Sequence, residues 1–449
     1  MIDEIMNFLR NKKIAILGFG LEGKSSYNFI RKHMKEKMLT IICEEECEEE
    51  KKQILEKDKF VTFVTGENYL ENLEQYDIIL KTPGISFKNL DISKFKDKIT
   101  SQLEFFLEYK KCMTIGVTGT KGKSTTSTLL YEVLKNQGKK VYLLGNIGAP
   151  VFDDIDEIED DSTVVLELSS HALQYLKKST EIAILLNIYE EHLDHYKDFD
   201  EYINAKLNIF KNQANTGIAI FNADNKNIKY KFKQNDYGIT LQGERITNNT
   251  FELKENEIFF NNKKIFKPDE NKMLLKGEHN INNIMFVLAV CEIMNLDFQK
   301  AIEIIQTFKP LEHRLEYVGN IEGVDYYNDS IATIPEATIC SINALKNVNT
   351  LIVGGKDRGV NLENLIKFLK TTEIENIICL PKTGEYIADG MKNSDKNIVK
   401  VLNMEEAVQE AKKITEKNKI CLLSPAAASY GFFKNFMERG KIFKKNVLS

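Results

Sequence analysis

Residues 112–138 read CMTIGVTGTKGKSTTSTLLYEVLKNQG, and this stretch decides the fold of the middle of the chain. Its first part, CMTIGVTG (112–119), is rich in apolar and β-branched residues, which predicts a buried strand. Its last part, STTSTLLYEVLKNQG (124–138), predicts a helix that stops at Gly138. A strand that leads through a short turn into a helix is typical of a parallel α/β sheet.

The turn between this strand and helix has the chemistry of a phosphate-binding loop. It ends in Gly122-Lys123-Ser124, although the strict G-x4-GK[ST] spacing fails because Val117 stands five residues before Gly122. The physical argument still holds, because successive backbone amides at the start of a helix bind phosphate oxygens. The Lys123 ammonium would neutralise phosphate charge, and the Ser124 hydroxyl is a suitable Mg²⁺ ligand.

Strands and helices alternate along the rest of the chain and predict an α/β fold with three units. We place the domains at residues 1–101, 102–309 and 310–449, with a break at Lys309–Pro310. The acidic run 44–52 is expected to be the solvated start of a helix. The other expected elements are strands at 13–18, 39–43, 60–64, 77–84, 140–145, 163–169, 182–188, 350–355, 376–380, 398–402 and 419–424, helices at 24–37 and 277–295, a strand pair within 317–329, and a hairpin that turns at Asn261–Asn262.

A second glycine motif, Gly18-Phe-Gly20-Leu-Glu-Gly23, follows the first strand and opens a helix. Glycines in such a turn let backbone amides approach a diphosphate, and Glu44 follows the second strand, where a Rossmann domain would hold a ribose. The pattern is compatible with a tight turn that binds nothing, with NAD(P), or with another nucleotide. From the residues alone these alternatives stay open.

The composition restricts the class of protein. The chain has 449 residues with 61 Lys and Arg against 66 Asp and Glu, and this net charge of −5 argues against a general nucleic-acid binder. None of the seven cysteines forms a CxxC pair, which favours reduced thiols. The apolar run at 284–291 is far shorter than the ~18 residues of a membrane helix. We expect a soluble, cytoplasmic protein without membrane insertion.

Taken with the phosphate loop, several further blocks resemble one known family. GTKGKST (119–125) is similar to the ATP-binding signature of the Mur ligase family, which also includes folylpolyglutamate synthetase. The C-terminal block and the first glycine motif most resemble the members that add D-glutamate to UDP-N-acetylmuramoyl-L-alanine. The other blocks, in order, are ELSS (167–170), NIYEEHLDHY (187–196), AKLNIF (205–210), GEHNINN (277–283), LEHRLE (311–316), YYNDSIAT (326–333) and LLSPAAASYGFFKNFMERG (422–440).

The resemblance implies a Rossmann-like UDP-binding domain, a central P-loop domain that binds ATP, and a C-terminal Rossmann-like domain that binds the amino acid. It implies ATP and two Mg²⁺ ions as cofactors, with a carbamylated Lys206, which from the sequence alone is only a helical lysine. The implied catalytic residues are Lys123, His192 and Lys206, and the implied metal ligands are Ser124, Glu167, His192 and Lys206.

The resemblance also implies three sets of substrate-binding residues. For ATP they are Gly119, Thr120, Lys121, Gly122, Lys123, Ser124, Thr125, Asn280, Arg314 and Asp329. For the UDP-linked acceptor they are Gly20, Leu21, Glu22, Glu44, Gly84, Asn146 and Ser169. For glutamate they are Arg358, Ser429, Tyr430 and Phe436, where a guanidinium and hydroxyls suit two carboxylates.

Two local features qualify this assignment. His192 and His195 are three residues apart, but we do not interpret them as a zinc site, because no cysteine or third histidine accompanies them in the sequence. Ile331 stands where many relatives of this kind have a lysine, and an isoleucine cannot pair with a substrate carboxylate. This change puts the chirality of the incoming glutamate in doubt.

We therefore expect an ATP-dependent ligase that joins D-glutamate to UDP-N-acetylmuramoyl-L-alanine through an acyl phosphate, in peptidoglycan precursor synthesis. The alternatives are the same reaction with L-glutamate, another amide ligase of the family, a P-loop NTPase that acts as a motor or switch, and an NAD-dependent enzyme. The expected partners are the two substrates alone, without nucleic acid, and the family leads us to expect a monomer.

Overall fold

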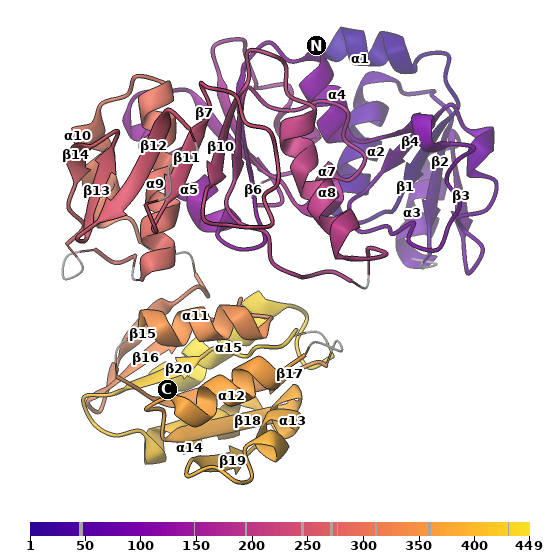
Figure 1. Cartoon of the computed structure of the whole chain (residues 1–449). Coiled ribbons are helices and arrows are strands. Elements are labelled where there is room, and N and C mark those ends of the chain that lie inside the picture. Colours follow the sequence, from indigo (N-terminus) through magenta and orange to yellow (C-terminus); the bar gives the residue numbers. More distant parts are fainter. Residues whose placement is uncertain are drawn as a thin grey trace. The chain divides into compact units, whose positions relative to one another are not determined.

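The structure is a computed structural model that describes residues 1–44, 48–147, 149–193, 195–243, 247–269, 273–275, 277–309, 312–345, 347–357, 361–429 and 431–449. These residues form two compact units (Figure 1). The first unit comprises Met1–Pro268 and Asn282–Ile305, and the second comprises Asp269–Ile281 and Gln306–Ser449. Among the described residues, no helix is long and apolar enough to cross a membrane.

The N-terminal sheet has five parallel strands in the order β3-β2-β1-β4-β5. The predicted strand at 39–43 is confirmed to the residue as β2, because a strand buried on both faces is a continuous apolar run. The helix predicted from Lys24 begins three residues earlier, directly after Gly20. The bounds are β1 (Ile14–Leu17), β2 (Leu39–Cys43), β3 (Val61–Thr65), β4 (Ile78–Lys81), β5 (Ile99–Thr100), α1 (Ile2–Leu9), α2 (Leu21–His33), α3 (Glu48–Lys57), α4 (Gln102–Tyr109), η1 (Leu73–Gln75) and η2 (Lys96–Lys98).

The central sheet of the first unit has nine strands in the order β14-β13-β12-β11-β10-β9-β6-β8-β7. It is parallel from β7 to β12, and β12 to β14 form antiparallel hairpins. The bounds are β6 (Met113–Thr118), β7 (Val141–Gly145), β8 (Thr163–Glu167), β9 (Ile182–Leu185), β10 (Ile218–Asn222), β11 (Tyr237–Thr240), β12 (Asn249–Lys254), β13 (Glu257–Phe260), β14 (Lys263–Phe266), α5 (Lys123–Asn136), α6 (Val151–Asp154), α7 (Ser170–Leu173), α8 (Phe199–Lys211), α9 (Glu278–Ile293) and α10 (Phe298–Thr307).

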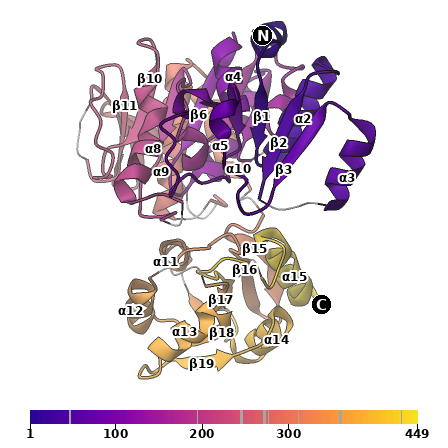
Figure 2. The same ribbon diagram turned by 90° about the vertical axis from the view of Figure 1, so that its right-hand side faces the viewer.

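The sheet of the second unit has six strands in the order β15-β16-β20-β17-β18-β19, and only β15 is antiparallel. One apolar core packs α11, α12 and α13 on one face, and another packs α14 and α15 on the other (Figure 2). The bounds are β15 (Glu316–Ile321), β16 (Val324–Asn328), β17 (Val348–Gly355), β18 (Asn376–Lys382), β19 (Asn397–Lys400), β20 (Ile420–Leu423), α11 (Pro335–Ala344), α12 (Glu363–Thr371), α13 (Thr383–Gly390), α14 (Met404–Ile414) and α15 (Phe436–Leu448).

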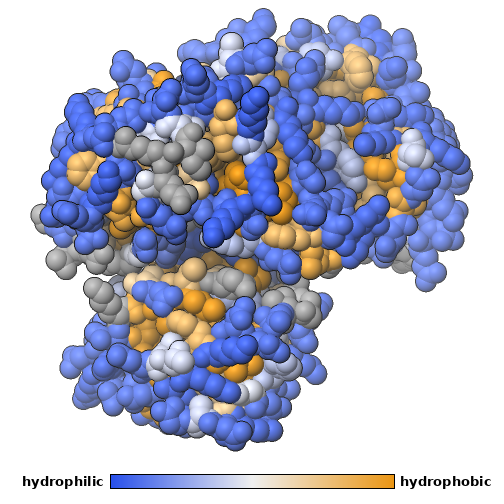
Figure 3. Space-filling view, viewed as in Figure 1, coloured by the Kyte–Doolittle hydropathy of each residue, from blue (hydrophilic) through white to orange (hydrophobic). Residues whose placement is uncertain are grey.

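Because neighbouring strands are parallel, the residues that follow them lie along one edge of the sheet. The three adjacent strands β8, β6 and β9 end at Glu167, Thr118 and Leu185, and the phosphate loop follows the middle one. Because ligands of open α/β sheets bind outside the carboxyl ends of the strands, this edge is where a site is expected. Hydrophilic side chains cover most of the face drawn in Figure 3, as the 28% charged composition predicts.

Candidate active site

The phosphate loop has the tight geometry that its glycines permit. Gly122 caps α5 with a φ of +87°, in the left-handed region that favours glycine. A Cβ on Gly119 would lie 2.9 Å from Leu186 Cβ, so a larger residue would not fit there without movement. Lys123 Nζ donates to the carbonyls of Gly119 and Thr120 at 2.9 and 3.0 Å. The Lys123 ammonium is therefore held against the loop, and its role toward phosphate stays a prediction.

Asn187, in the segment that follows β9, holds the loop through hydrogen bonds. The Asn187 carbonyl accepts from the Thr120 amide at 2.9 Å, and its Oδ1 accepts from the Lys121 amide at 2.8 Å. The Asn187 side-chain amide donates to the Lys121 carbonyl at 3.0 Å, and the hydroxyls of Thr120 and Tyr202 are 2.8 Å apart. Sequence reasoning did not single out Asn187 or Tyr202, although NIYEEHLDHY contains the former.

Glu167 ends β8 and is buried beside the start of α5. Its carboxylate accepts from Asn146 Nδ2 at 2.9 Å and from Ser127 Oγ at 3.4 Å. Ser127 lies three residues after Ser124 on α5, and residues with this spacing share one helix face. Ser169 has a structural role as well, because its hydroxyl caps α7 by accepting from the Ala172 amide at 3.1 Å. The structure thus brings Glu167, Asn146 and the Ser127 hydroxyl of α5 together.

Lys206 comes from α8 and reaches the same loop. Its side chain is buried, and Nζ donates to the Gly119 carbonyl at 2.8 Å. Burial lowers the pKa of Lys206 well below its ordinary value, and the nearby Lys123 ammonium lowers it further. A neutral amine is the nucleophilic form of a lysine. Lys123 and Lys206 therefore share Gly119 as a hydrogen-bond acceptor, and the fold gives Lys206 a chemistry that its sequence context did not suggest.

His192 follows β9 in a strained backbone conformation, with a φ of +62° for a residue that has a Cβ. Its neighbour Glu191 forms an ion pair with Lys121 at 3.1 Å and lies 3.8 Å from His192 Nε2. Burial opposes the charge of Glu191, but the Lys121 ammonium, with His192 and Lys123, outweighs it and lowers the pKa to about 2. Glu191 is therefore a charged residue of this site that sequence reasoning missed.

A third histidine lies beside His192 and His195 in the structure, although it stands apart from them in the sequence. The His171 ring centroid is 4.7 Å from that of His192 and 4.1 Å from that of His195. Burial, together with both neighbouring rings, lowers the pKa of His171 to about 2 and keeps it neutral. Within the described parts of the chain, no group of three His, Cys, Asp or Glu side chains is arranged to hold a metal ion.

The first glycine motif packs against the end of β4. A Cβ on Gly18 would lie 2.1 Å from Thr82 Oγ1, and a Cβ on Gly23 would lie 2.0 Å from the Gly18 carbonyl oxygen. Gly20 and Gly84 have no atom within 4 Å of such a Cβ, so their surroundings are open. The remaining predicted acceptor-binding residues of this sheet are Leu21, which is exposed, Glu22, which is half-buried, and Glu44, which is exposed at the end of β2.

Asp329 belongs to the second unit and is fully buried there. Its Oδ2 accepts from the hydroxyls of Ser341 and Ser424 at 2.6 and 2.9 Å, and its Oδ1 accepts from the Leu315 amide at 3.2 Å. Burial raises the pKa of Asp329 to about 6, against these hydrogen bonds and the charge of Arg314. Asn280 and Arg314 also belong to this unit, with Asn280 in the first turn of α9.

The predicted glutamate-binding stretches of the second unit meet around a guanidinium that sequence reasoning missed. Arg439 is fully buried and donates to Ser330 Oγ, the Ser330 carbonyl and the Ala427 carbonyl at 3.0, 2.7 and 3.0 Å. Ser330 Oγ in turn donates to the carbonyl of Phe436 at 2.8 Å. Ile331 is the residue after Ser330, and Ser429 stands two residues after Ala427 in the chain. Arg358 and Tyr430 lie outside the described residues.

Comparison with known proteins places this arrangement in a family. The family model for the Mur ligase middle domain matches residues 117–291, and that for the Mur ligase, glutamate ligase domain matches residues 313–427. UDP-N-acetylmuramoylalanine–D-glutamate ligases from Clostridium tetani and Clostridium acetobutylicum are each 36% identical to the chain, covering 99% of it and 98% of their own lengths.

Solved structures show the same fold at lower identity. The UDP-N-acetylmuramate–alanine ligase MurC from Thermotoga maritima has a TM-score of 0.60 at 19% identity, covering 98% of this chain and 99% of its own. The MurF ligase from Thermotoga maritima in complex with ADP has a TM-score of 0.60 at 17% identity, covering 98% of this chain and 96% of its own. With its two family domains in order and a 36% identity that extends over 99% of its length, the chain belongs to the Mur ligase family.

Proposed function

We propose that the chain is an ATP-dependent ligase that adds D-glutamate to UDP-N-acetylmuramoyl-L-alanine in peptidoglycan precursor synthesis. The observation that carries the ligase chemistry is the buried Lys206 amine, 2.8 Å from the carbonyl of Gly119 in the phosphate loop. The names of the relatives that match the whole chain support the choice of substrates. Because the reaction consumes ATP, we place it in the cytoplasm, and we expect a monomer.

The proposed roles follow the three predicted domains. Residues 1–101 bind the UDP-linked acceptor at the first glycine motif, residues 102–309 bind ATP at the phosphate loop, and residues 310–449 bind glutamate. Asn146 and Ser169 contact the acceptor, and Arg358, Ser429, Tyr430 and Phe436 contact glutamate. Asn280, Arg314 and Asp329 complete the nucleotide-binding set.

The proposed reaction has two steps. An oxygen of the acceptor carboxylate attacks the γ-phosphorus of ATP, so that an acyl phosphate forms and ADP leaves. The amine of glutamate then attacks the acyl carbon, loses a proton, and the tetrahedral intermediate expels inorganic phosphate as the amide forms. Lys123 and the amides of the loop offset the charge that spreads over the transferring phosphoryl group, where positioning and electrostatics dominate catalysis.

The residues around the loop fit a divalent cation that prefers oxygen ligands. Glu167 offers a buried carboxylate beside the hydroxyl face of α5, so Glu167 and Ser124 are the proposed ligands of one Mg²⁺. His192 and a carbamate on Lys206 are the proposed ligands of a second, and the depressed pKa of Lys206 supports carbamate formation, which needs the neutral amine. Bound Mg²⁺ would supply neutralisation of phosphate charge.

The experiment that tests this function is phosphate release by the purified protein with ATP, Mg²⁺ and UDP-N-acetylmuramoyl-L-alanine, with D-glutamate or L-glutamate added in parallel. We expect release only with D-glutamate, and no release by Lys123→Ala. L-glutamate is the second candidate, because Ile331 stands where many relatives have a lysine and cannot pair with a carboxylate of the incoming substrate. Release with L-glutamate alone would establish that alternative, and release without an acceptor would contradict the ligase assignment.

A further inference from the structure

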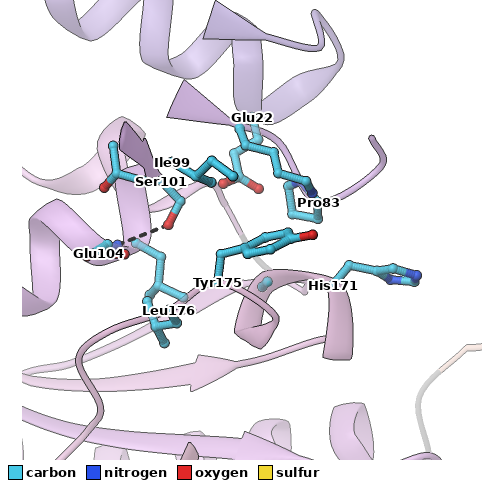
Figure 4. A pocket seen from close by; sticks show the side chains of 12 residues that line it. Glu22, Pro83, Ile99, Ser101, Glu104, His171, Tyr175 and Leu176 are labelled. Atoms are coloured by element: carbon cyan, nitrogen blue, oxygen red, sulfur yellow. Dashed lines mark hydrogen bonds between the residues drawn. The ribbon is translucent and has the colours of Figure 1, made fainter. Parts of the chain in front are cut away.

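A small cavity of the first unit lies between the end of β4 and the segment that follows α7. It holds about 20 Å³, which is room for one group the size of a water molecule. Figure 4 shows Glu22 and Pro83 above the Tyr175 ring and His171 to the right of it. The titratable side chains that line the cavity are Glu22, Lys81, Glu104, His171 and Tyr175.

Lys81 is the cation of this cavity, and sequence reasoning did not single it out. Its side chain is only 6% exposed, and its ammonium lies 5.6 Å from the ring centroids of both Phe87 and Tyr175. Nζ donates to the Thr82 carbonyl at 3.1 Å, which uses one of its three N–H groups. Among the described residues, no carboxylate lies within ion-pair distance of Lys81. A buried ammonium in this situation is costly unless an anion approaches it.

Glu22, the acid whose charge acts on Lys81, compensates this charge only in part. Burial raises the pKa of Glu22 to about 7, against the Gln102 hydrogen bond and the charge of Lys81. Burial lowers the pKa of Lys81 to about 8, so the ammonium is still mostly charged at neutral pH. The cavity therefore presents a cation with spare hydrogen-bond donors and no full counter-ion.

The position of the cavity indicates which anion it takes. Glu22 belongs to the first glycine motif, and His171 packs its ring against His192. The acceptor of the proposed function must extend from that motif, where its diphosphate binds, toward His192, where its carboxylate reacts. The cavity lies between these two points. On the basis of the proposed function, we propose that Lys81 is a further acceptor-binding residue whose ammonium holds one anionic oxygen of the UDP-linked substrate.

The test compares Lys81→Met, which keeps an unbranched side chain between the two rings, with Lys177→Met. Lys177 is an exposed lysine of the adjacent segment that donates to the carbonyls of Asp97 and Ile99. The measurements are Kd for UDP-N-acetylmuramoyl-L-alanine and for UDP by titration calorimetry, KM for ATP, and Tm. We expect Lys81→Met to weaken acceptor binding about 10- to 100-fold, the range for a lost hydrogen bond to a charged group. In Lys177→Met, the acceptor Kd should change by less than about twofold. The KM for ATP should change by less than about twofold in both variants.

The outcomes show which part of the substrate supplies the anionic oxygen. They also separate a failure of the Lys81 proposal from a failure of the proposed function. Weaker binding of UDP as well assigns the oxygen to the diphosphate, whereas weaker binding of the full acceptor alone assigns it to the carboxylate end. An unchanged acceptor Kd in Lys81→Met, whatever its Tm, overturns the proposal and leaves a structural lysine. If Lys81→Met does not fold, Lys81→Gln, which keeps donors without charge, serves the same comparison. If the wild-type protein itself binds no acceptor, the result contradicts the proposed function, and it is thereby distinguished from a failure of the Lys81 proposal alone.

Discussion

At the residue scale, Asp329 shows how a buried acid in the second unit is held by hydroxyls. Ser341 and Ser424 each have a second acceptor within reach, the Ala337 carbonyl and the Thr338 hydroxyl, so both hydroxyls can rotate. An asparagine amide could therefore donate to them while its oxygen accepts from Leu315. Asp329→Asn is thus a substitution that removes the charge with little change of shape.

Asp329→Asn should become more stable relative to the wild type as pH rises. The pKa of Asp329 is about 6 in the folded protein against 3.8 for an unperturbed aspartate, so its contribution is fully present below pH 3.8 and is lost as pH rises through about 6. Between pH 4 and pH 7.5 the difference in unfolding free energy should move in favour of the variant by about 2 kcal/mol. Calorimetric Tm values at both pH values measure this, and a difference that does not change with pH would contradict it.

The sequence could identify some single residues but not others. Lys123 and Ser124 are recognisable because a strand, a glycine turn and a helix start occur together within a few residues. Lys206 and Lys81 are ordinary lysines in the sequence, and only tertiary burial gives them unusual chemistry. The contact between Lys206 and Gly119 joins residues 87 positions apart, and neither hydropathy nor spacing encodes such a contact.

At the element scale, two glycines of the first glycine motif differ in their surroundings, one being tightly packed and the other open to a ligand. A Cβ added to Gly23 would meet the Gly18 carbonyl oxygen at 2.0 Å, and a backbone atom cannot move aside cheaply. Gly20 has open space and a φ of −73°, which any residue adopts. The two glycines therefore have different reasons to be glycine, although they belong to one motif.

Gly23→Ala should lower the stability of the protein by about 1–3 kcal/mol, the usual cost of overpacking. Gly20→Ala should leave Tm unchanged but raise the KM for the acceptor, because its added methyl group would stand where a diphosphate approaches the backbone. Thermal unfolding and acceptor kinetics of the two variants measure these effects. A Tm loss in Gly20→Ala equal to that in Gly23→Ala would show that both positions serve packing alone.

Element prediction succeeded where strands are buried on both faces. The strands at 13–18, 39–43 and 163–169 are confirmed because apolar runs between helices have few other interpretations. The hairpin at Asn261–Asn262 is confirmed as well, and both residues have the positive φ that such a two-residue turn requires. Strands β10 and β11 and helix α1 were not predicted, because they are short and polar residues flank them.

At the scale of the whole molecule, the chain forms two compact units, each with its own sheets and apolar core. The predicted division at residues 1–101, 102–309 and 310–449 remains a proposal about function. All the proposed acceptor contacts, including Gly20, Asn146 and Lys81, belong to the first unit. The proposed glutamate contacts, such as Ser429 and Phe436, belong to the second.

This separation predicts that each substrate stabilises one unit. Calorimetry should resolve two unfolding transitions, because each unit buries its own core. The acceptor, at about 100 times its Kd, should stabilise the first unit by about 2.7 kcal/mol and leave the other transition in place, because a ligand stabilises only what it binds. D-glutamate should raise the transition of the second unit instead. At the same acceptor concentration, a 10- to 100-fold weaker Kd should reduce this stabilisation to about 0.4–1.4 kcal/mol in Lys81→Met, and Lys177→Met should retain it in full. A single transition that either substrate raises would show that the two units unfold as one body.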